Sequence, residues 1–397
     1  MTGNGLITNP IDFGSIIQNN FYPRGGDTVY MRGGTYSGNW ISYLTGSSLL
    51  PITVTNYPGE RAIIDGGLTS NGNYVMWKNI EFTDSSFIDR TSDNGHNGIN
   101  VVGSGNKVIN CFLRNFPQGL ISGHGNGLDL IVHGCLFYYN GWNSSNGHGL
   151  YPQNSAITYK TMTKNIVFNN GGYGFHLYGS TGGVDNFWLE GNTAFDNGTI
   201  GYGSPLYNYH IGGTLPSTGH VLKRNYGYGA STRVGYGSGN VVSNVSIQDN
   251  VFDELSSMAL TTCVPIAFDG NKLYGPTSGF DVLDWLNNVY GALGALPDAY
   301  YLEANEYNEN RANLTIFNQQ EEASTINVNV GSIFGQTGTV EVHNVQDYFV
   351  DIQTLTITAG VIVVNMQAVN RTVETPVGWE APATTFPQFG CFVIEKV

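Results

Sequence analysis

Charge is scarce in this sequence. Charged residues make up 12% of the 397 residues, and 16 basic against 30 acidic residues give a formal net charge of −14. A nucleic-acid-binding surface needs clustered Lys and Arg, so the composition excludes nucleic acid as a partner. The sequence also lacks any run of about 18 apolar residues, which excludes a membrane-spanning helix.

Cysteine is rare, and a leader is not visible. The four cysteines are too few and too scattered for a disulfide framework, and none forms a Cys-x-x-Cys pair. The first residues, Met1–Gly5, show neither a basic segment nor the start of an apolar one, so no signal peptide is recognised. This leaves a cytoplasmic protein or a secreted one whose leader was removed. The acidic, weakly charged composition favours the secreted protein.

Glycine, asparagine and aromatic residues are abundant instead. There are 54 Gly, 24 Tyr and 20 Phe residues, and hydrophobic residues reach 41% of the chain, which is enough to bury a core. Gly and Asn are poor helix formers and good turn formers. The glycines follow no three-residue period, which excludes collagen. The composition therefore predicts many short strands joined by tight turns.

One pattern recurs along residues 75–274: alternating apolar residues, an Asn, and a second short alternating strand. Copies follow one another at roughly 21 to 33 residues, inside the length range of stacked structural repeats. Period-two strands in such a repeat predict a β-solenoid with three short strands in each turn and one shared core. We interpret the repeated position as structural, because Asn tolerates a left-handed bend and its amide can pair with the turns above and below. The residues at this position are Asn79, Asn110, Cys135, Asn165, Asn192, Asn225, Asn250 and Asn271.

Two N-terminal segments resemble the first turns of a known family. Gly25–Gly38, with the sequence GGDTVYMRGGTYSG, resembles the opening turn of the right-handed parallel β-helices of pectate-lyase-like, polysaccharide-active proteins. Pro51–Glu60 and the following Ile63–Gly66 resemble their second turn. Gly147–Asn154 resembles a motif of bacterial β-helix proteins to which we assign no activity. The resemblance covers about residues 25–275 and implies a secreted protein that acts on a polysaccharide.

The predicted fold class is all-β: a right-handed parallel β-helix with an N-terminal helical cap and a C-terminal β-sandwich-like domain. Solenoid ends need caps, and Ile11–Gln18 places apolar residues at helical spacing. Beyond residue 300, alternating strands such as Ile326–Val330 lack the repeated Asn, which favours an antiparallel domain. We assign residues 1–24 to the cap, 25–299 to the β-helix and 300–397 to the C-terminal domain. Carbohydrate binding is an alternative role for that domain.

The first strand of each turn can be aligned on its inward apolar residue. That residue is Ile99, Leu120, Leu150, Leu177, Ile211 and Val234 in successive turns. Strand side chains alternate and turns lie about 4.8 Å apart, so the neighbouring residues form one outward column. The column contains Asn100, Tyr151, His176, Tyr178, His210 and Arg233. The same alignment points His148 inward at the strand edge, from which it can turn into the groove.

These residue types suit β-elimination of a uronate polymer. The long bends 141–147 and 198–209 flank the column as the walls of a groove, and in the resembled family substrates bind along this face. Arg can bind the uronate carboxylate bidentately, while His and Tyr can serve as base and acid. The candidate catalytic residues are His176, His210, Tyr151, Tyr178 and Arg233. The candidate substrate contacts are Asn100, His148, Gln153, Trp142 and Tyr207.

Several alternatives stay open. A uronate C5-epimerase would share the proton-abstraction step. A glycoside hydrolase needs two carboxylates about 5 to 10 Å apart, which the column lacks, but the bends carry Asp89, Asp93, Asp185 and Asp253. A non-catalytic carbohydrate-binding or adhesin solenoid would use the groove without chemistry.

The residues require no cofactor. Ca²⁺, which the resembled lyases commonly bind, stays open although the column has no carboxylate cluster. Stacked histidines could also share a metal ion. We expect a monomer whose partner is a polysaccharide.

Overall fold

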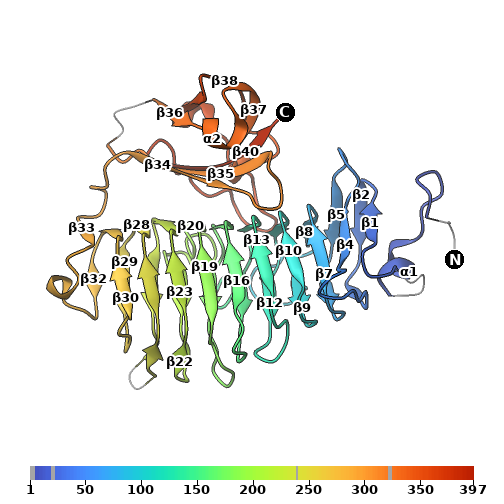
Figure 1. The fold of residues 1–397 in the computed structure, drawn as a ribbon, viewed down its shortest axis with the longest axis horizontal. Helices are drawn as coiled ribbons and strands as arrows, with labels where there is room; N and C mark the ends of the chain where they lie inside the picture. Colours follow the sequence, from blue (N-terminus) through green and yellow to red (C-terminus); the bar gives the residue numbers. More distant parts are fainter. Residues whose placement is uncertain (1–4, 19–22, 238–239, 321–323) are drawn as a thin grey trace.

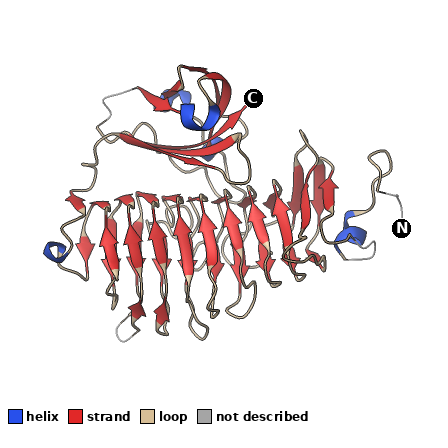
Figure 2. Cartoon of the chain, viewed as in Figure 1, coloured by secondary structure: helices blue, strands red, loops and turns tan. Residues whose placement is uncertain are grey.

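Stacked turns of three short strands form most of the molecule. The computed structural model describes residues 5–18, 23–237, 240–320 and 324–397. In these residues the strands of successive turns line up into three long parallel sheets, and Figure 1 shows the resulting solenoid. Helices are few and short (Figure 2): α1 (Phe13–Ile17), α2 (Gly331–Phe334) and 3₁₀ turns at Val282–Asp284, Val345–Asp347 and Ala368–Asn370. None of the described helices has the length and apolar character that crossing a membrane requires.

Each full turn contributes one strand to each parallel sheet, and β33 extends sheet two alone. Sheet one contains β1 (Thr28–Met31), β4 (Ile52–Asn56), β7 (Val75–Lys78), β10 (Lys107–Ile109), β13 (Ile131–His133), β16 (Lys160–Thr163), β19 (Phe187–Glu190), β23 (Val221–Lys223), β27 (Ser246–Gln248) and β30 (Ala267–Asp269). Sheet two contains β2 (Gly34–Ser37), β5 (Ala62–Asp65), β8 (Glu81–Thr83), β11 (Phe112–Arg114), β14 (Leu136–Tyr138), β17 (Ile166–Phe168), β20 (Thr193–Phe195), β24 (Tyr226–Tyr228), β28 (Val251–Asp253), β31 (Lys272–Tyr274) and β33 (Val289–Gly291). Sheet three contains β3 (Trp40–Ser42), β6 (Leu68–Ser70), β9 (Ile99–Val101), β12 (Gln118–Ser122), β15 (His148–Pro152), β18 (Phe175–Leu177), β21 (Tyr207–Ile211), β25 (Ser231–Val234), β29 (Ser256–Leu260) and β32 (Thr277–Ser278). A short extra pair joins β22 (Ser217–Thr218) to β26 (Val242–Ser243).

Apolar side chains stack inside the solenoid because the turns pair in register. Each residue of one such stack in sheet one is 2% exposed or less. Burying a side chain of this kind stabilises the fold by roughly 1.5 to 3 kcal/mol. The stack contains Val54, Trp77, Val108, Val132, Met162, Leu189, Leu222, Ile247 and Phe268.

A column of asparagine amides runs along the bend between sheets one and two. The backbone N–H and the Nδ2 of Asn165 both donate to Oδ1 of Asn192, at 2.9 and 3.0 Å. The same pattern repeats through Asn225, Asn250, Asn271 and Asn288. At the other end Cys135 N–H donates to Asn165 Oδ1, and Cys111 N–H donates to Cys135 Sγ.

The predicted places of Asn79 and Asn110 in this column are wrong. Both have a φ of 53° and occupy the left-handed residue of the bend, one position before the inward one. Asn110 aligns with Gly134, since the neighbouring pairs are Ile109 with His133 and Phe112 with Leu136. Asn suits both positions of the bend, so the sequence pattern alone does not separate them. Cys111 takes the inward position in the turn of Asn110.

A second amide column, absent from the sequence analysis, runs along the bend between sheets two and three. Its Nδ2 groups donate from Asn140 to Asn170, from Asn170 to Asn197 and from Asn197 to Asn208, at 2.8 to 3.0 Å. The recurring Asn-Gly pairs at 140–141, 170–171 and 197–198 are its sequence signal. Asn208 Nδ2 then donates to Oε1 of Glu254 at 2.7 Å. A glutamate therefore ends a series of neutral amides.

The C-terminal domain is one curled antiparallel sheet. Its strand order is β34 (Ala299–Ala304), β35 (Arg311–Phe317), β40 (Phe389–Lys396), β37 (Thr337–Asn344), β38 (Ile352–Thr358), β39 (Val361–Asn365) and β36 (Thr325–Asn329). The two edges approach each other, because the Asn329 N–H donates to the Tyr300 hydroxyl at 3.1 Å. Together with the parallel sheets and α1, this domain confirms the predicted fold class.

The C-terminal domain packs on the outward face of sheet two (Figure 1). There Phe168 stacks on Tyr138 and on Phe195, with ring centroids 5.0 and 4.8 Å apart, and Phe389 of the C-terminal sheet lies 5.1 Å from Phe195. Residues 372–385, which we call the strap, reach the next bend. Trp379 donates to Asn143 Oδ1 at 2.9 Å, which ties the strap to the bend 141–147.

The buried carboxyl of Glu254 should make the free energy of unfolding depend on pH. The Glu254 side chain is fully buried, and burial raises the pKa of its carboxyl to about 8. The unfolded chain releases this proton near pH 4.5. We therefore expect the contribution of Glu254 to the free energy of unfolding to be complete below pH 4.5. Between pH 4.5 and 8 that contribution should fall by about 1.4 kcal/mol per pH unit. Glu254→Gln, which keeps the amide pattern, should remove that slope.

Urea unfolding between pH 5 and 8 measures the effect. Glu309→Gln, at an exposed glutamate, is the matched control and should keep the slope of the wild type. Parallel stability curves for wild type and Glu254→Gln would show that Glu254 is already ionised in the folded protein.

Candidate active site

Two outward columns of side chains emerge from sheet three instead of one. In β15, Gly149 and Leu150 both face the core: a Cβ on Gly149 would lie 2.8 Å from Val167, and Leu150 is fully buried. Two consecutive inward residues break strict alternation, so His148 and Tyr151 both face outward. The predicted inward orientation of His148 is therefore wrong: its ring packs against Tyr151, Tyr173 and His176 on the outward side of the strand.

The predicted alignment of the strands also slips by two residues at one turn. Leu150 pairs with Phe175, whereas the sequence alignment matched it with Leu177. A shift of two residues leaves the inward and outward positions of the strand unchanged, so His176 still faces outward. The shift also places His176 next to Tyr151 in the neighbouring strand. The later pairs, Leu177 with Ile211 and His176 with His210, agree with the alignment.

Three histidines meet on this face. His148 Nε2 lies 2.7 Å from His176 Nδ1, and the ring centroids of His176 and His210 are 5.0 Å apart. Tyr151 and Tyr178 stack on His176, each with its centroid 5.0 Å away and with interplanar angles of 14° and 11°. We call these histidines, the surrounding tyrosines and Arg233 the histidine cluster. Its tyrosines are Tyr151, Tyr173, Tyr178, Tyr207 and Tyr236.

Arg233 is the cation of the histidine cluster. Its Nη2 lies 3.1 Å from His210 Nε2 and 3.3 Å from His210 Nδ1. Its guanidinium carbon lies 4.4 Å from the ring centre of Tyr207 and 5.2 Å from that of Tyr236. Its Nε is buried without a hydrogen-bond partner. Arg114 and Arg224 pair with glutamates, whereas Arg233 forms no ion pair within the described residues. The site therefore presents a positive charge without a matching carboxylate.

Burial keeps the three histidines neutral. They are 2%, 7% and 1% exposed for His148, His176 and His210. Burial lowers the pKa of His148 to about 3. It also lowers the pKa of His176 and of His210 well below the usual value, and Arg233 adds to both shifts. The phenols keep their protons, because burial raises the pKa of Tyr151 and Tyr178.

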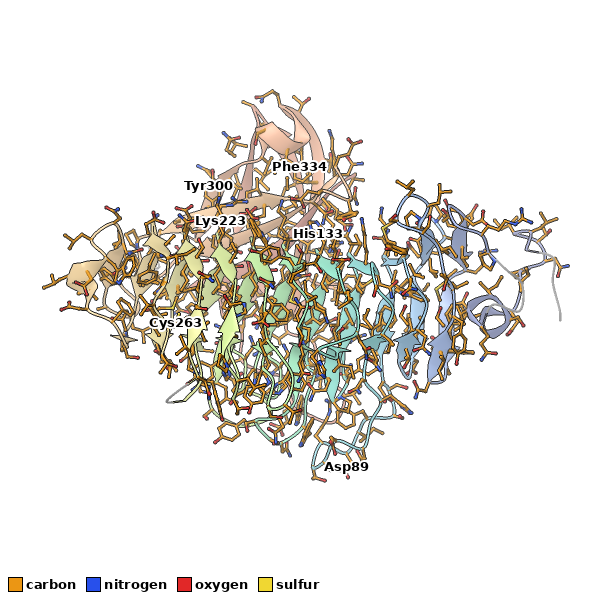
Figure 3. All side chains as sticks on the ribbon, turned by 60° about the horizontal axis from the view of Figure 1, so that its bottom comes forward. Asp89, His133, Lys223, Cys263, Tyr300 and Phe334 are labelled. Carbon is orange, nitrogen blue, oxygen red and sulfur yellow. The ribbon has the colours of Figure 1, made fainter. Side chains whose placement is uncertain are left out.

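The remaining predicted residues lie at different distances from the cluster. Gln153 is adjacent, and its Nε2 donates to the Tyr178 carbonyl at 3.2 Å. Asn100 is aligned with Ile121 and through it with Tyr151, so it lies two turns away. Trp142 belongs to the bend 141–147 that the strap holds. Lys223 lies on sheet one and Asp89 at the edge of the molecule, both labelled in Figure 3.

Tyr173 and Tyr236 belong to the cluster and were not among the predicted residues. Tyr173 stacks on His148 with centroids 5.1 Å apart, and Tyr236 lies 5.6 Å from His210. The pattern of an outward residue, two inward residues and another outward one would have identified Tyr173, since Gly174 and Phe175 repeat Gly149 and Leu150. No group of three His, Cys, Asp or Glu side chains in the described part of the chain is arranged to hold a metal ion.

Comparisons with known proteins show the fold. The sequence matches no protein-family model and no curated protein. Pectate lyase Pel9A superposes with a TM-score of 0.53 and 18% identity over 68% of this chain and 77% of its own. An alginate lyase from Paenibacillus sp. str. FPU-7 superposes with a TM-score of 0.45 and 16% identity over 70% of this chain and 95% of its own. The Dettilon tailspike protein superposes with a TM-score of 0.34 and 14% identity over 95% of this chain and 81% of its own. The likeness to Pel9A confirms the predicted resemblance to pectate-lyase-like β-helices at the level of the fold.

The buried histidines predict an absence of titration in the neutral range. We expect His148, His176 and His210 to stay neutral as the pH falls from 8 to 6, whereas free histidine titrates near 6.5. The unfolded chain takes up these protons and the folded one does not, so acidification below pH 6.5 should favour unfolding. Imidazole ¹⁵N chemical shifts measure the protonation directly. A midpoint near 6.5 for any of the three would contradict the buried, neutral cluster.

Proposed function

We propose that the protein cleaves an acidic polysaccharide by β-elimination on the outward face of sheet three. The observation that carries this proposal is Arg233, a cation on the outward face of sheet three that has no carboxylate partner in the described residues and an unsatisfied Nε donor. A guanidinium fork binds a carboxylate bidentately, so a uronate would supply the missing anion. The neutral imidazoles and phenols beside it are the groups that proton transfer requires.

The roles follow from the hydrogen-bonding capacity of each group. Arg233 only donates, so in the free protein it occupies a lone pair of His210. When Arg233 turns to a uronate carboxylate, that lone pair becomes available as the base for the C5 proton. The C5–H electrons form the C4–C5 double bond as the C4–O4 bond breaks. Tyr178, whose phenol is protonated, donates its proton to the departing O4.

The tyrosines would also bind the sugar rings. Tyr151, Tyr207 and Tyr236 line the same face and offer flat apolar surfaces with a polar edge. We further propose that the protein acts outside the cell, where such polymers occur. A C5-epimerase would use the same base but would return the proton to C5 and leave no double bond.

Ultraviolet absorbance tests this proposal, because β-elimination creates an unsaturated uronide. We expect absorbance to rise when the protein meets at least one member of a panel of uronic-acid polymers. Arg233→Ala should lower kcat/KM at least about 100-fold, since it removes the carboxylate donor. Lys223→Ala, a loss of positive charge on sheet one, is the matched control and should leave the rate unchanged.

Full activity in Arg233→Ala would exclude this arginine as the carboxylate ligand. Repeating the assay with EDTA and with added Ca²⁺ measures whether a cation takes part. Retained polymer binding without any product would favour the adhesin alternative.

Glycoside hydrolysis is the second candidate, and one cavity favours it. A cavity of about 330 Å³ lies between the strap and the bend after sheet two. Burial raises the pKa of Asp196 there to about 7, and the exposed Glu380 lies on the facing strap. An acid that keeps its proton, opposite a second carboxyl group, is the arrangement of glycosidases. The other lining residues are Asn169, Thr199, Ile200, Ala381, Pro382 and Ala383.

New reducing ends without ultraviolet absorbance would identify hydrolysis. If this cavity carries it, Asp196→Asn should reduce the release of reducing ends at least about 100-fold, because the amide cannot donate the proton. Asp129→Asn, at an exposed bend residue that shares the left-handed backbone of Asp196, is the control and should behave as the wild type. Equal rates for the two variants would rule out Asp196 as the acid.

A further inference from the structure

A directional hydrogen-bond chain crosses the histidine cluster. It begins at the backbone N–H of Tyr173, which lies 3.2 Å from His148 Nδ1. A backbone N–H can only donate, so this ring nitrogen must accept and carries no proton. His148 is neutral, with a pKa of about 3, and its single ring proton is therefore on Nε2.

The same reasoning assigns the proton of His176. His148 Nε2 is 2.7 Å from His176 Nδ1. Since His148 donates across this contact, His176 Nδ1 accepts, and the proton of the neutral His176 ring must sit on Nε2. Both tautomers are assigned from the hydrogen-bond partners, beginning with the backbone donor of Tyr173.

The ring of His148 is held in one place. Tyr173 lies parallel to it, at 5.1 Å between centroids and 5° between planes, and Tyr151 packs against it edge-on at 5.3 Å. Only 2% of its surface is exposed. Both of its ring nitrogens are also occupied, Nδ1 by the Tyr173 N–H and Nε2 by His176 Nδ1, so His148 can influence a ligand on this face only through His176.

His176 and His210 thus offer opposite hydrogen-bonding groups to a ligand. Arg233 Nη2, which only donates, lies 3.1 Å from Nε2 and 3.3 Å from Nδ1 of His210, so His210 has a lone pair to offer once Arg233 turns to a carboxylate. His176 offers an N–H on Nε2. A neutral imidazole N–H can stabilise negative charge that develops on a substrate oxygen without giving up its proton. Two neighbouring neutral histidines would then perform different tasks because their donors differ: His148 is held in place beside His176, whereas Arg233 can leave His210 for a carboxylate.

We propose that His148 is a positioning residue that locks His176 in the tautomer with the proton on Nε2, so that His176 donates to the uronate carboxylate during elimination. The substrate acceptor rests on the proposed function, whereas the tautomer does not. Without His148, the two neutral tautomers of His176 would be close in energy, and a fraction of the molecules would present a lone pair where the carboxylate binds.

Two substitutions separate positioning from packing. His148→Gln keeps one acceptor for the Tyr173 N–H and one donor for His176 Nδ1. His148→Leu fills the same space with an apolar side chain and removes both hydrogen bonds. Thermal unfolding and far-ultraviolet circular dichroism establish that each variant of the full chain is folded.

Imidazole ¹⁵N chemical shifts of the substrate-free protein give the decisive measurement, with His176 assigned by the signal that His176→Gln lacks. We expect the proton on Nε2 in the wild type and in His148→Gln, and a mixture of tautomers in His148→Leu. A proton on Nδ1 in the wild type would overturn the proposal, as would an unchanged tautomer in His148→Leu. If His148→Leu does not fold, the tautomer of His176 in the wild type and its retention in His148→Gln decide whether the proposal holds.

Kinetics then test the consequence for catalysis. His148→Leu should lower kcat about 10- to 100-fold with little change in KM, and His148→Gln should restore most of the rate. Wild-type kinetics in His148→Leu would overturn the positioning role. If no polymer is cleaved even by the wild type, the proposed function fails while the tautomer measurement still decides whether His148 orders His176.

Discussion

Parallel stacking in register is the constraint on which this molecule depends. Every bend repeats above and below itself, so an inward polar group meets its own kind in the next turn. An unpaired buried amide costs about 1 to 3 kcal/mol, and a series of asparagines avoids that cost because each Nδ2 donates to the Oδ1 of the following turn. The columns through Asn192 and through Asn170 therefore do the same work at two bends. Glu254 joins the second column because its Oε1 accepts from Asn208 Nδ2, as the amide oxygen of an asparagine would.

The same constraint arranges the outward side chains. A fixed distance between turns stacks rings at about 5 Å on two faces of the solenoid. On sheet two the stack of Tyr138, Phe168 and Phe195 serves as the docking surface for the C-terminal domain. On sheet three the equivalent stack contains His176 and His210 between tyrosines. One geometric rule thus produces a structural interface on one side and a cluster of titratable rings on another.

The solenoid, and which residues of the sheet-three strands face outward, could largely be predicted from the sequence, because apolar alternation and the repeated Asn are strong signals. The prediction failed where one residue type suits two positions, as with Asn79 and Asn110. It failed again at His148, since a pair of inward residues breaks the alternation that the alignment assumed. Tyr173 was missed for the same reason. Such details depend on bend length and on contacts between turns, which a single sequence does not record.

The charge of the molecule makes the environment of Arg233 informative. With 30 acidic against 16 basic residues, most arginines can find a carboxylate, and Arg114 and Arg224 do. Arg233 instead lies against His210 and the faces of two tyrosines, none of which carries negative charge. These contacts hold a guanidinium less strongly than an ion pair would, so a ligand carboxylate can displace them at little cost. The net charge of −14 would repel the anionic polymer proposed as substrate at long range, so the proposed recognition rests on short-range contacts of this kind.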